Sequence, residues 1–264
     1  MKKLCSLFLS LLIVCLCAVG VCADEEQLSA YVTISDENGD LVMVYERIGF
    51  YDYDNDGKIT INDALASAHI EKYADGIDGY ASENSAYGLS LTKLWGAQTG
   101  AYGYYVNNAS PASLLDEIKD GDHIQAFVYT DTATFSDTFC FFDTVETECA
   151  VDDTVTLTLS ALTYDENWNT VTVPVANAEI LVNGEPVGAR TDENGEASFV
   201  MKAGGKVTVS ARSEDMTLVP PVCRIHSDAG SILVLMVIMM IAIVAVAMLT
   251  FFIIKKHIAT RTLK

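Results

Sequence analysis

Four aspartates at fixed spacing are the clearest chemical feature of the sequence. Asp52, Asp54 and Asp56 alternate with other residues, Gly57 follows them directly, and Asp63 comes shortly after. Carboxylates this close together repel one another unless a cation lies among them. An EF-hand-like loop places oxygen ligands at positions 1, 3, 5 and 12 and a glycine at position 6, where the chain turns sharply. The sequence therefore predicts one Ca²⁺ site in this loop.

Other positions of the loop supply the remaining ligands. Lys58, at position 7, would bind the ion through its backbone carbonyl, and Thr60, at position 9, is the next ligand. Asp63 opens a helical pattern, so its carboxylate would meet both the ion and the free amides of the first turn. A solvated acidic turn is the alternative interpretation, but it explains neither the apolar Ile59 at position 8 nor Asp63.

The pattern Asp-x-Asp-x-Asp-Gly-x-Ile-x-x-x-Asp of residues 52–63 resembles the calcium loop of dockerins. Dockerins carry two such repeats, whereas this chain has one, and the preceding residues 41–51 are typical of a strand. The resemblance therefore implies calcium binding and not cohesin docking. A single extracellular loop of this kind binds with a dissociation constant on the order of 0.1–1 mM, which suits a structural ion.

A second candidate site comes from aromatic residues mixed with small polar ones. Trp95, Tyr104, Tyr105 and Asn107 could together stack a flat ring or a sugar. Core packing and hairpin pairing are the alternative roles for these side chains.

Groups that could carry catalysis are few. Residues 24–230 contain three histidines, His69, His123 and His226, and no nucleophile elbow, phosphate-binding loop or metal-binding histidine pair. The sequence therefore predicts a protein that is not an enzyme.

Two apolar segments set the expected topology. Residues 1–23 begin with lysines and end in a small residue, which is typical of a secretory signal peptide cleaved after Ala23; lipidation near Cys22 is the alternative. Residues 231–254 form an uncharged apolar run about 34 Å long as a helix, enough to span a bilayer. Since basic residues follow in the tail, 255–264, the tail should be cytoplasmic and the N-terminal domains extracellular. The sequence thus predicts a single-pass protein of the cell membrane.

The outer part of the chain is strongly acidic. All 36 acidic residues and ten of the 16 basic residues fall in residues 24–230, which gives this part a formal charge of −26. Such a surface repels nucleic acids and anionic headgroups, so no nucleic-acid partner is expected.

Three cysteines remain once the predicted signal peptide is removed. Cys140 and Cys149 are nine residues apart and could close a short disulfide loop. Cys223 would then be free to link two copies of the chain in a disulfide-bonded dimer.

The rest of the pattern predicts a mainly β protein. Most segments alternate apolar and polar residues between Gly, Asn, Asp or Pro, as strands and hairpins do. One helix is expected at residues 61–74, and a shorter one at 110–122, where Pro111 stands in the first turn and Gly121 ends it. A change in composition near residues 143–154 divides the outer part into two domains.

The first domain, residues 24–145, resembles the transcobalamin C-terminal-like family over residues 31–143. The resemblance is carried by the helix sequence INDALASA and by residues that match a hairpin and a Gly-Asp-x-Ile strand: Tyr104, Tyr105, Asn107, Gly121, Asp122 and Ile124. It implies an α+β, β-grasp-like fold with the calcium loop as an insertion. In animal relatives this module helps to cover a corrin, so a corrin-like cofactor is an implied ligand.

The second domain, residues 150–226, is similar to bacterial Ig-like and carboxypeptidase-regulatory-like β-sandwiches. The residues that carry this resemblance are NAEILVNGEPV and TDENGEASFVMKAGGKVTVSA. Such domains usually act as spacers. The leading functional hypothesis is therefore a membrane-anchored bacterial surface protein with a calcium-stabilised domain for adhesion to a protein or glycan. Capture of a corrin-like cofactor for a transporter and a purely structural envelope role are the alternatives.

Overall fold

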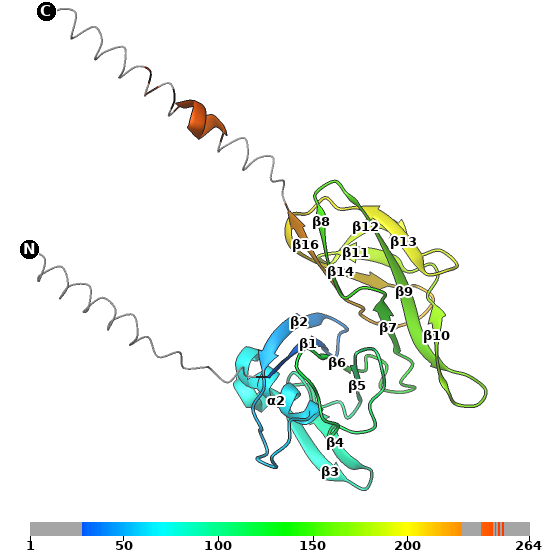
Figure 1. The fold of residues 1–264 in the computed structure, drawn as a ribbon. Helices are drawn as coiled ribbons and strands as arrows, with labels where there is room; N and C mark the ends of the chain where they lie inside the picture. Colours follow the sequence, from blue (N-terminus) through cyan, green and yellow to red (C-terminus); the bar gives the residue numbers. More distant parts are fainter. Residues whose placement is uncertain (1–27, 229–238, 245, 247, 249, 251–264) are drawn as a thin grey trace, which may run out of the picture.

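The computed structural model describes residues 28–228, 239–244, 246, 248 and 250 (Figure 1). The predicted signal peptide, residues 1–23, and the predicted tail, residues 255–264, lie outside this part of the chain, as does most of the predicted membrane span. Residues 239–244 are helical. In the described parts of the chain, no helix is both long enough and apolar enough to cross a membrane.

The described chain is mainly β, as predicted, and begins with a four-stranded sheet. Its strand order is β2-β1-β6-β5; β1 runs parallel to β6, and the other neighbours are antiparallel. A two-stranded hairpin, β3–β4, and a helix complete this N-terminal unit. The elements are β1 (Ser29–Ser35), β2 (Leu41–Gly49), α2 (Ile61–Lys72), η1 (Gly76–Gly79), β3 (Ala81–Ser85), β4 (Gly88–Lys93), β5 (Tyr102–Val106) and β6 (His123–Val128).

Helix α2 occupies the middle of the N-terminal core. Every residue from Ile61 to His69 is buried, because the sheet covers one side of the helix and the 89–97 and 114–118 segments cover another. Small side chains such as Ala64 and Ala68 allow this close packing. A helix enclosed in this way does not need a strong amphipathic pattern.

The prediction of a short helix at residues 110–122 is wrong. The carbonyl oxygens of Leu114 and Asp116 accept hydrogen bonds from the amides of Asn62 and Ile61, at 2.9 and 3.1 Å. The first amides of a helix have no partner within the helix. Residues 114–116 therefore accept hydrogen bonds from the free amides at the start of α2 instead of forming a helix.

The C-terminal unit is a β-sandwich made of two sheets. One sheet has the order β10-β9-β7-β15, with β13 also paired to β9, and the other has the order β12-β11-β14-β16-β8. The buried core lies between them and includes Leu157, Ile180 and Ile225. The strands are β7 (Thr138–Phe142), β8 (Glu146–Ala150), β9 (Thr154–Tyr164), β10 (Thr170–Pro174), β11 (Glu179–Val182), β12 (Glu185–Arg190), β13 (Glu196–Val200), β14 (Gly205–Arg212), β15 (Leu218–Val219) and β16 (Cys223–Asp228).

The boundary between the two units lies earlier in the chain than predicted. Residues up to 145 were expected in the first domain, but β7 pairs with β9, and β8 pairs with β16. Both strands therefore belong to the sandwich. The sandwich also extends past the predicted end at residue 226, since β16 continues to Asp228.

The cysteine predictions do not agree with the structure, in which all three thiols are free. Cys140 on β7 and Cys149 on β8 lie in different sheets of the sandwich, so they do not close a loop. Cys223 on β16 has no exposed surface, which leaves it inaccessible to another copy of the chain. The thiol of Cys140 donates to the carbonyl oxygen of Val219 at 3.2 Å.

Candidate metal centre and the other predicted sites

The loop between β2 and α2 coils around the side chain of Asp52. Oδ2 of this residue accepts a hydrogen bond from the amide of Gly57 at 2.9 Å, and Oδ1 accepts one from the amide of Asp56 at 3.1 Å. Gly57 has a positive φ of 86°, a conformation that a residue without a Cβ adopts readily. The sharp turn predicted at this glycine is therefore present.

Asp63 anchors the other end of the loop. It is fully buried in the first turn of α2, and its Oδ2 accepts hydrogen bonds from the amide and hydroxyl of Thr60, at 2.9 and 2.6 Å. Together the two residues form a capping box. Oδ1 accepts a hydrogen bond from the amide of Tyr53 at 2.8 Å, so Asp63 ties the loop to the helix.

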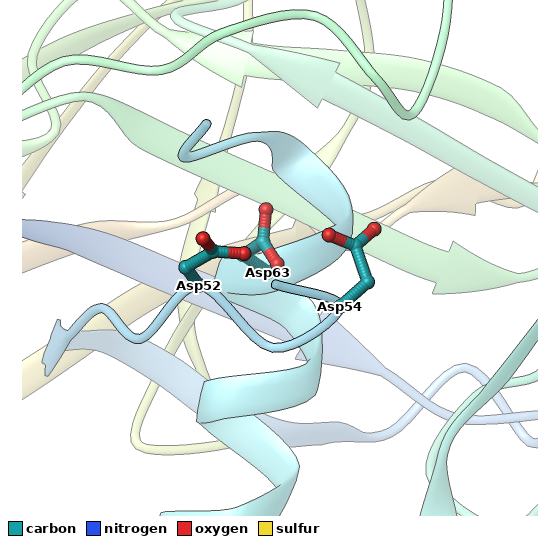
Figure 2. A group of neighbouring side chains, drawn as sticks. All are labelled: Asp52, Asp54 and Asp63. Atoms are coloured by element: carbon teal, nitrogen blue, oxygen red, sulfur yellow. The ribbon is translucent and has the colours of Figure 1, made fainter. Parts of the chain in front are cut away.

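Three of the predicted ligands converge. Asp52, Asp54 and Asp63 each offer a carboxylate oxygen, and these three atoms lie within 4.8 Å of one another. Figure 2 shows Asp63 between the other two carboxylates. Burial raises the pKa of Asp54, and the charges of Asp63, Asp56 and Asp52 raise it further.

The other predicted ligands have different partners. The carboxylate of Asp56 accepts a hydrogen bond from the amide of Lys58 at 2.8 Å and is not part of the converging group. The side chain of Lys58 reaches outward to Glu117, with 3.4 Å between Nζ and Oε1. The hydroxyl of Thr60 is already used by Asp63.

The carboxylate oxygens of Asp52, Asp54 and Asp63 are suitable ligands for a hard cation such as Ca²⁺. Calcium takes six to eight oxygen ligands, including carboxylates and backbone carbonyls. The three converging carboxylates supply three of these ligands, in a loop that remains open to solvent at Asp54. Soft-metal chemistry does not fit, because no thiol or imidazole belongs to this group.

The four residues predicted to bind a cofactor do not form one pocket. Tyr104 and Tyr105 are adjacent on β5 and therefore face opposite sides of the sheet. Tyr104 packs against the N-terminal core, and burial raises the pKa of its phenol. Tyr105 instead stacks on Phe139 of the sandwich, with ring centroids 3.7 Å apart.

Trp95 and Asn107 also have structural roles. Trp95 packs beside His69 and Tyr73 at the end of α2, with ring centroids 5.3 and 5.2 Å away. Asn107 accepts a hydrogen bond from the amide of His123 at 2.9 Å and donates one to Asp122 at 2.8 Å, which joins β5 to β6. A hollow of about 270 Å³ includes Tyr104 but none of the other three residues.

Sequence reasoning missed the part played by His69. Its Nδ1 lies 2.6 Å from the carbonyl oxygen of Leu65, and its Nε2 accepts a hydrogen bond from the amide of Trp95 at 3.0 Å. These two contacts define a neutral ring with the proton on Nδ1. Burial lowers the pKa of His69 to about 4, which keeps the ring neutral.

Sequence reasoning also missed the residue that joins the two units. Arg224 on β16 donates from Nη2 to Glu46 Oε1 at 2.8 Å and to the carbonyl oxygen of Val44. A positive φ of 46° at Tyr45 interrupts the regular strand there. Nothing in the local pattern around Arg224 indicates this contact, because its partners lie about 180 residues away in the sequence.

Comparison with known proteins leaves the chain without an assigned family. No protein-family model and no curated protein matches it. The first four Ig domains of Dscam1 isoform 9.44 superpose on 55% of this chain with 8% identity and a TM-score of 0.21. This chain covers only 31% of that structure. The D0-D1 domain of intimin superposes on 56% of this chain, covering 80% of its own length, with 18% identity and a TM-score of 0.25. Similarity at this level carries no argument, and the sandwich is established by its own strand pairing.

Proposed function

We propose that this chain is a single-pass surface protein of a bacterium, which displays a calcium-stabilised domain for binding or adhesion and carries out no catalysis. The observation that carries the proposal is the convergence of carboxylate oxygens from Asp52, Asp54 and Asp63 within 4.8 Å. A bound Ca²⁺ would neutralise their repulsion and fix the loop against α2. The ion would therefore be structural.

Membrane anchoring is supported by the exposed residues of the C-terminal segment. Met239, Met240, Ile241 and Ile243 are apolar, helical and more than half exposed. Apolar residues on all sides of a helix are expected where the surroundings are lipid. The basic residues of the tail, 255–264, favour a cytoplasmic C-terminus.

The arrangement of the N-terminal unit supports a β-grasp-like domain. A helix packs on a mixed sheet in which β1 and β6 are parallel neighbours. In this proposal the sandwich is an Ig-like spacer that holds the N-terminal unit away from the membrane. Capture of a corrin-like cofactor has less support, because the hollow at Tyr104, at about 270 Å³, is below the usual range of 300–1,000 Å³ for small-molecule pockets.

The test is thermal unfolding of residues 24–228, a fragment that keeps all of β16, with calcium and then with a chelator. At 10 mM Ca²⁺ a site of the expected affinity should stabilise the fold by about 1.5–2.5 kcal/mol, which is a rise in Tm of about 3–8 °C. Isothermal titration calorimetry should give one site per chain. An unchanged Tm together with no heat of binding would exclude the calcium proposal.

A further inference from the structure

Aromatic side chains gather where the two units meet, and all of them except the partly buried Tyr129 are well exposed. Two come from the region that follows β6, Tyr129 and Phe135, whose ring centroids lie 5.5 Å apart. Two come from the β9–β10 hairpin, Tyr164 and Trp168, at 6.2 Å. Phe135, Tyr164 and Trp168 are each more than half exposed. Together with Asp131, Asp165 and Glu166 they form what we call the aromatic–acidic surface.

The pair Tyr129 and Phe135 and the pair Tyr164 and Trp168 belong to one surface, because side chains along β9 point alternately into the core and towards the junction. Leu159 and Ala161 point into the sandwich core, whereas Leu162 packs against the aromatic cluster at the junction of the two units. Tyr164 lies two residues after Leu162 and so shares its side of the strand. Burial raises the pKa of Tyr129, and Asp137 and Tyr164 raise it further, which agrees with a position of Tyr164 near Tyr129. Figure 1 shows the β9–β10 hairpin projecting from the sandwich.

Trp168 is held in an exposed position by a well-ordered turn. The carboxylate of Asp165 accepts hydrogen bonds from the amides of Asn167 and Asn169, both at 2.8 Å, and the amide of Trp168 donates to the carbonyl oxygen of Asp165 at 3.0 Å. The indole is nevertheless 82% exposed. A turn with this many internal bonds presents the ring at little further loss of conformational entropy on binding.

The hydroxyls of Tyr129 and Tyr164 have no hydrogen-bond partner among the described residues, so they too are available to a ligand.

The charge around these rings has one sign. Segments 129–137 and 162–170 contain Asp131, Asp137, Asp165 and Glu166 but no lysine or arginine. The described ion pairs leave Asp131, Asp165 and Glu166 without a cationic partner. Asp137 is buried and accepts hydrogen bonds from Thr130 and from the amide of Asp131, so it is not part of the surface. Lysine and arginine are attracted both to carboxylates and to the faces of tryptophan and tyrosine rings.

We propose that the aromatic–acidic surface binds a lysine- or arginine-rich segment of another protein. This inference deepens the proposed adhesive function and names the chemistry of its partner. A second copy of the chain is disfavoured as the partner, because its outer part carries the same formal charge of −26. Anionic lipid and nucleic acid are disfavoured for the same reason.

The experiment measures binding of fluorescein-labelled octalysine to the full chain in detergent micelles by fluorescence anisotropy. Trp168→Ala should weaken binding about tenfold, because the exposed ring is the main cation–π partner. Glu166→Gln should weaken it about threefold. Tyr87→Ala is the matched control, since Tyr87 is 97% exposed on the β3–β4 hairpin, away from this surface, and binding should not change.

Several results would overturn the proposal. Equal affinity of the wild type and Trp168→Ala would mean that net charge alone attracts the peptide. No binding of octalysine at 1 mM, or tighter Trp168-dependent binding of a neutral hexasaccharide, would exclude a basic partner. The calcium-dependent shift in Tm is measured on the same preparations, so failure of this surface is separate from failure of the calcium loop.

Discussion

Arg224 on β16 donates a hydrogen bond from Nη1 to the carbonyl oxygen of Tyr45 on β2, at 2.8 Å, and its guanidinium carbon lies 5.9 Å from the centre of the Tyr45 ring. The same guanidinium group also holds Glu46 and the carbonyl oxygen of Val44. One side chain of the sandwich therefore donates hydrogen bonds to three acceptors in the irregular part of β2. A planar group with several fixed donors is suited to this task, and an ammonium group is not.

Replacing Arg224 with lysine should therefore destabilise the junction. We expect the free energy of unfolding of residues 24–228 to fall by about 2–3 kcal/mol, because lysine cannot donate to all of the partly buried acceptors, the carbonyl oxygens of Val44 and Tyr45 and the carboxylate of Glu46. Urea unfolding monitored by circular dichroism provides the measurement. Arg212→Lys is the control, since Arg212 pairs with Glu179 at an exposed position and should change stability by no more than about 0.5 kcal/mol. Equal effects of the two substitutions would contradict this role for Arg224.

The calcium loop gives a prediction that separates its aspartates. Asp54→Asn should abolish the calcium-dependent rise in Tm, because Asp54 is one of the three converging carboxylates. The variant should also be slightly more stable than the wild type without calcium, since one source of repulsion is removed.

Asp56→Asn is the matched control for this prediction. Its side-chain oxygen can still accept the hydrogen bond from the amide of Lys58, and Asp56 is not part of the converging group. This variant should retain most of the calcium-dependent rise in Tm. If it loses the rise as completely as Asp54→Asn does, Asp56 is a ligand and the loop rearranges when it binds the ion.

Sequence spacing and local structure together explain why the first and last aspartates of the loop converge. Asp52, Gly57 and Asp63 all lie within twelve residues, so a loop that turns at glycine and ends in a helix brings the first and last aspartates together. The same local reasoning located α2. Local sequence reasoning did not distinguish Asp56 from the other aspartates. The direction of each side chain in the loop depends on which backbone amides donate hydrogen bonds to its carboxylate.

Contacts between distant segments were beyond sequence reasoning. The prediction that Tyr104 and Tyr105 share one pocket was wrong. Adjacent residues of a strand point to opposite faces of the sheet, so the sequence itself could have excluded this pairing. The predicted helix near Leu114 failed because its carbonyl is taken by the start of α2. Strand β7 follows the first unit in sequence but pairs with β9, and no local pattern specifies that choice.

Acid should destabilise the fold through two buried histidines. Burial lowers the pKa of His69 and of His123 to about 4, from the ordinary value of 6.5. The unfolded chain therefore binds more protons than the folded chain between pH 6.5 and 4, so the free energy of unfolding falls as the pH drops through this range. Each histidine accounts for up to about 3 kcal/mol of that loss.

Urea unfolding at pH 7.0, 5.5 and 4.5 measures this dependence. A His69→Gln variant should be less stable at pH 7.0, because it loses the contacts to Leu65 and Trp95, but it should lose less on acidification. An identical dependence on pH in the variant and the wild type would show that His69 does not remain neutral in the folded state.

Gly103 on β5 allows a direct test of cross-strand packing, because it is paired with Phe127 on β6. A Cβ at this position would lie 2.2 Å from Cζ of Phe127, which is 1% exposed and therefore has little room to move. Gly103→Ala should reduce the free energy of unfolding by about 2–3 kcal/mol through overpacking. In a Phe127→Leu background the added methyl group has space, so the same substitution should be nearly neutral. A double-mutant cycle measured by urea unfolding should give a coupling energy of about 2 kcal/mol between positions 103 and 127. Strictly additive effects would mean that Gly103 is required for its backbone conformation and not for the space beside Phe127.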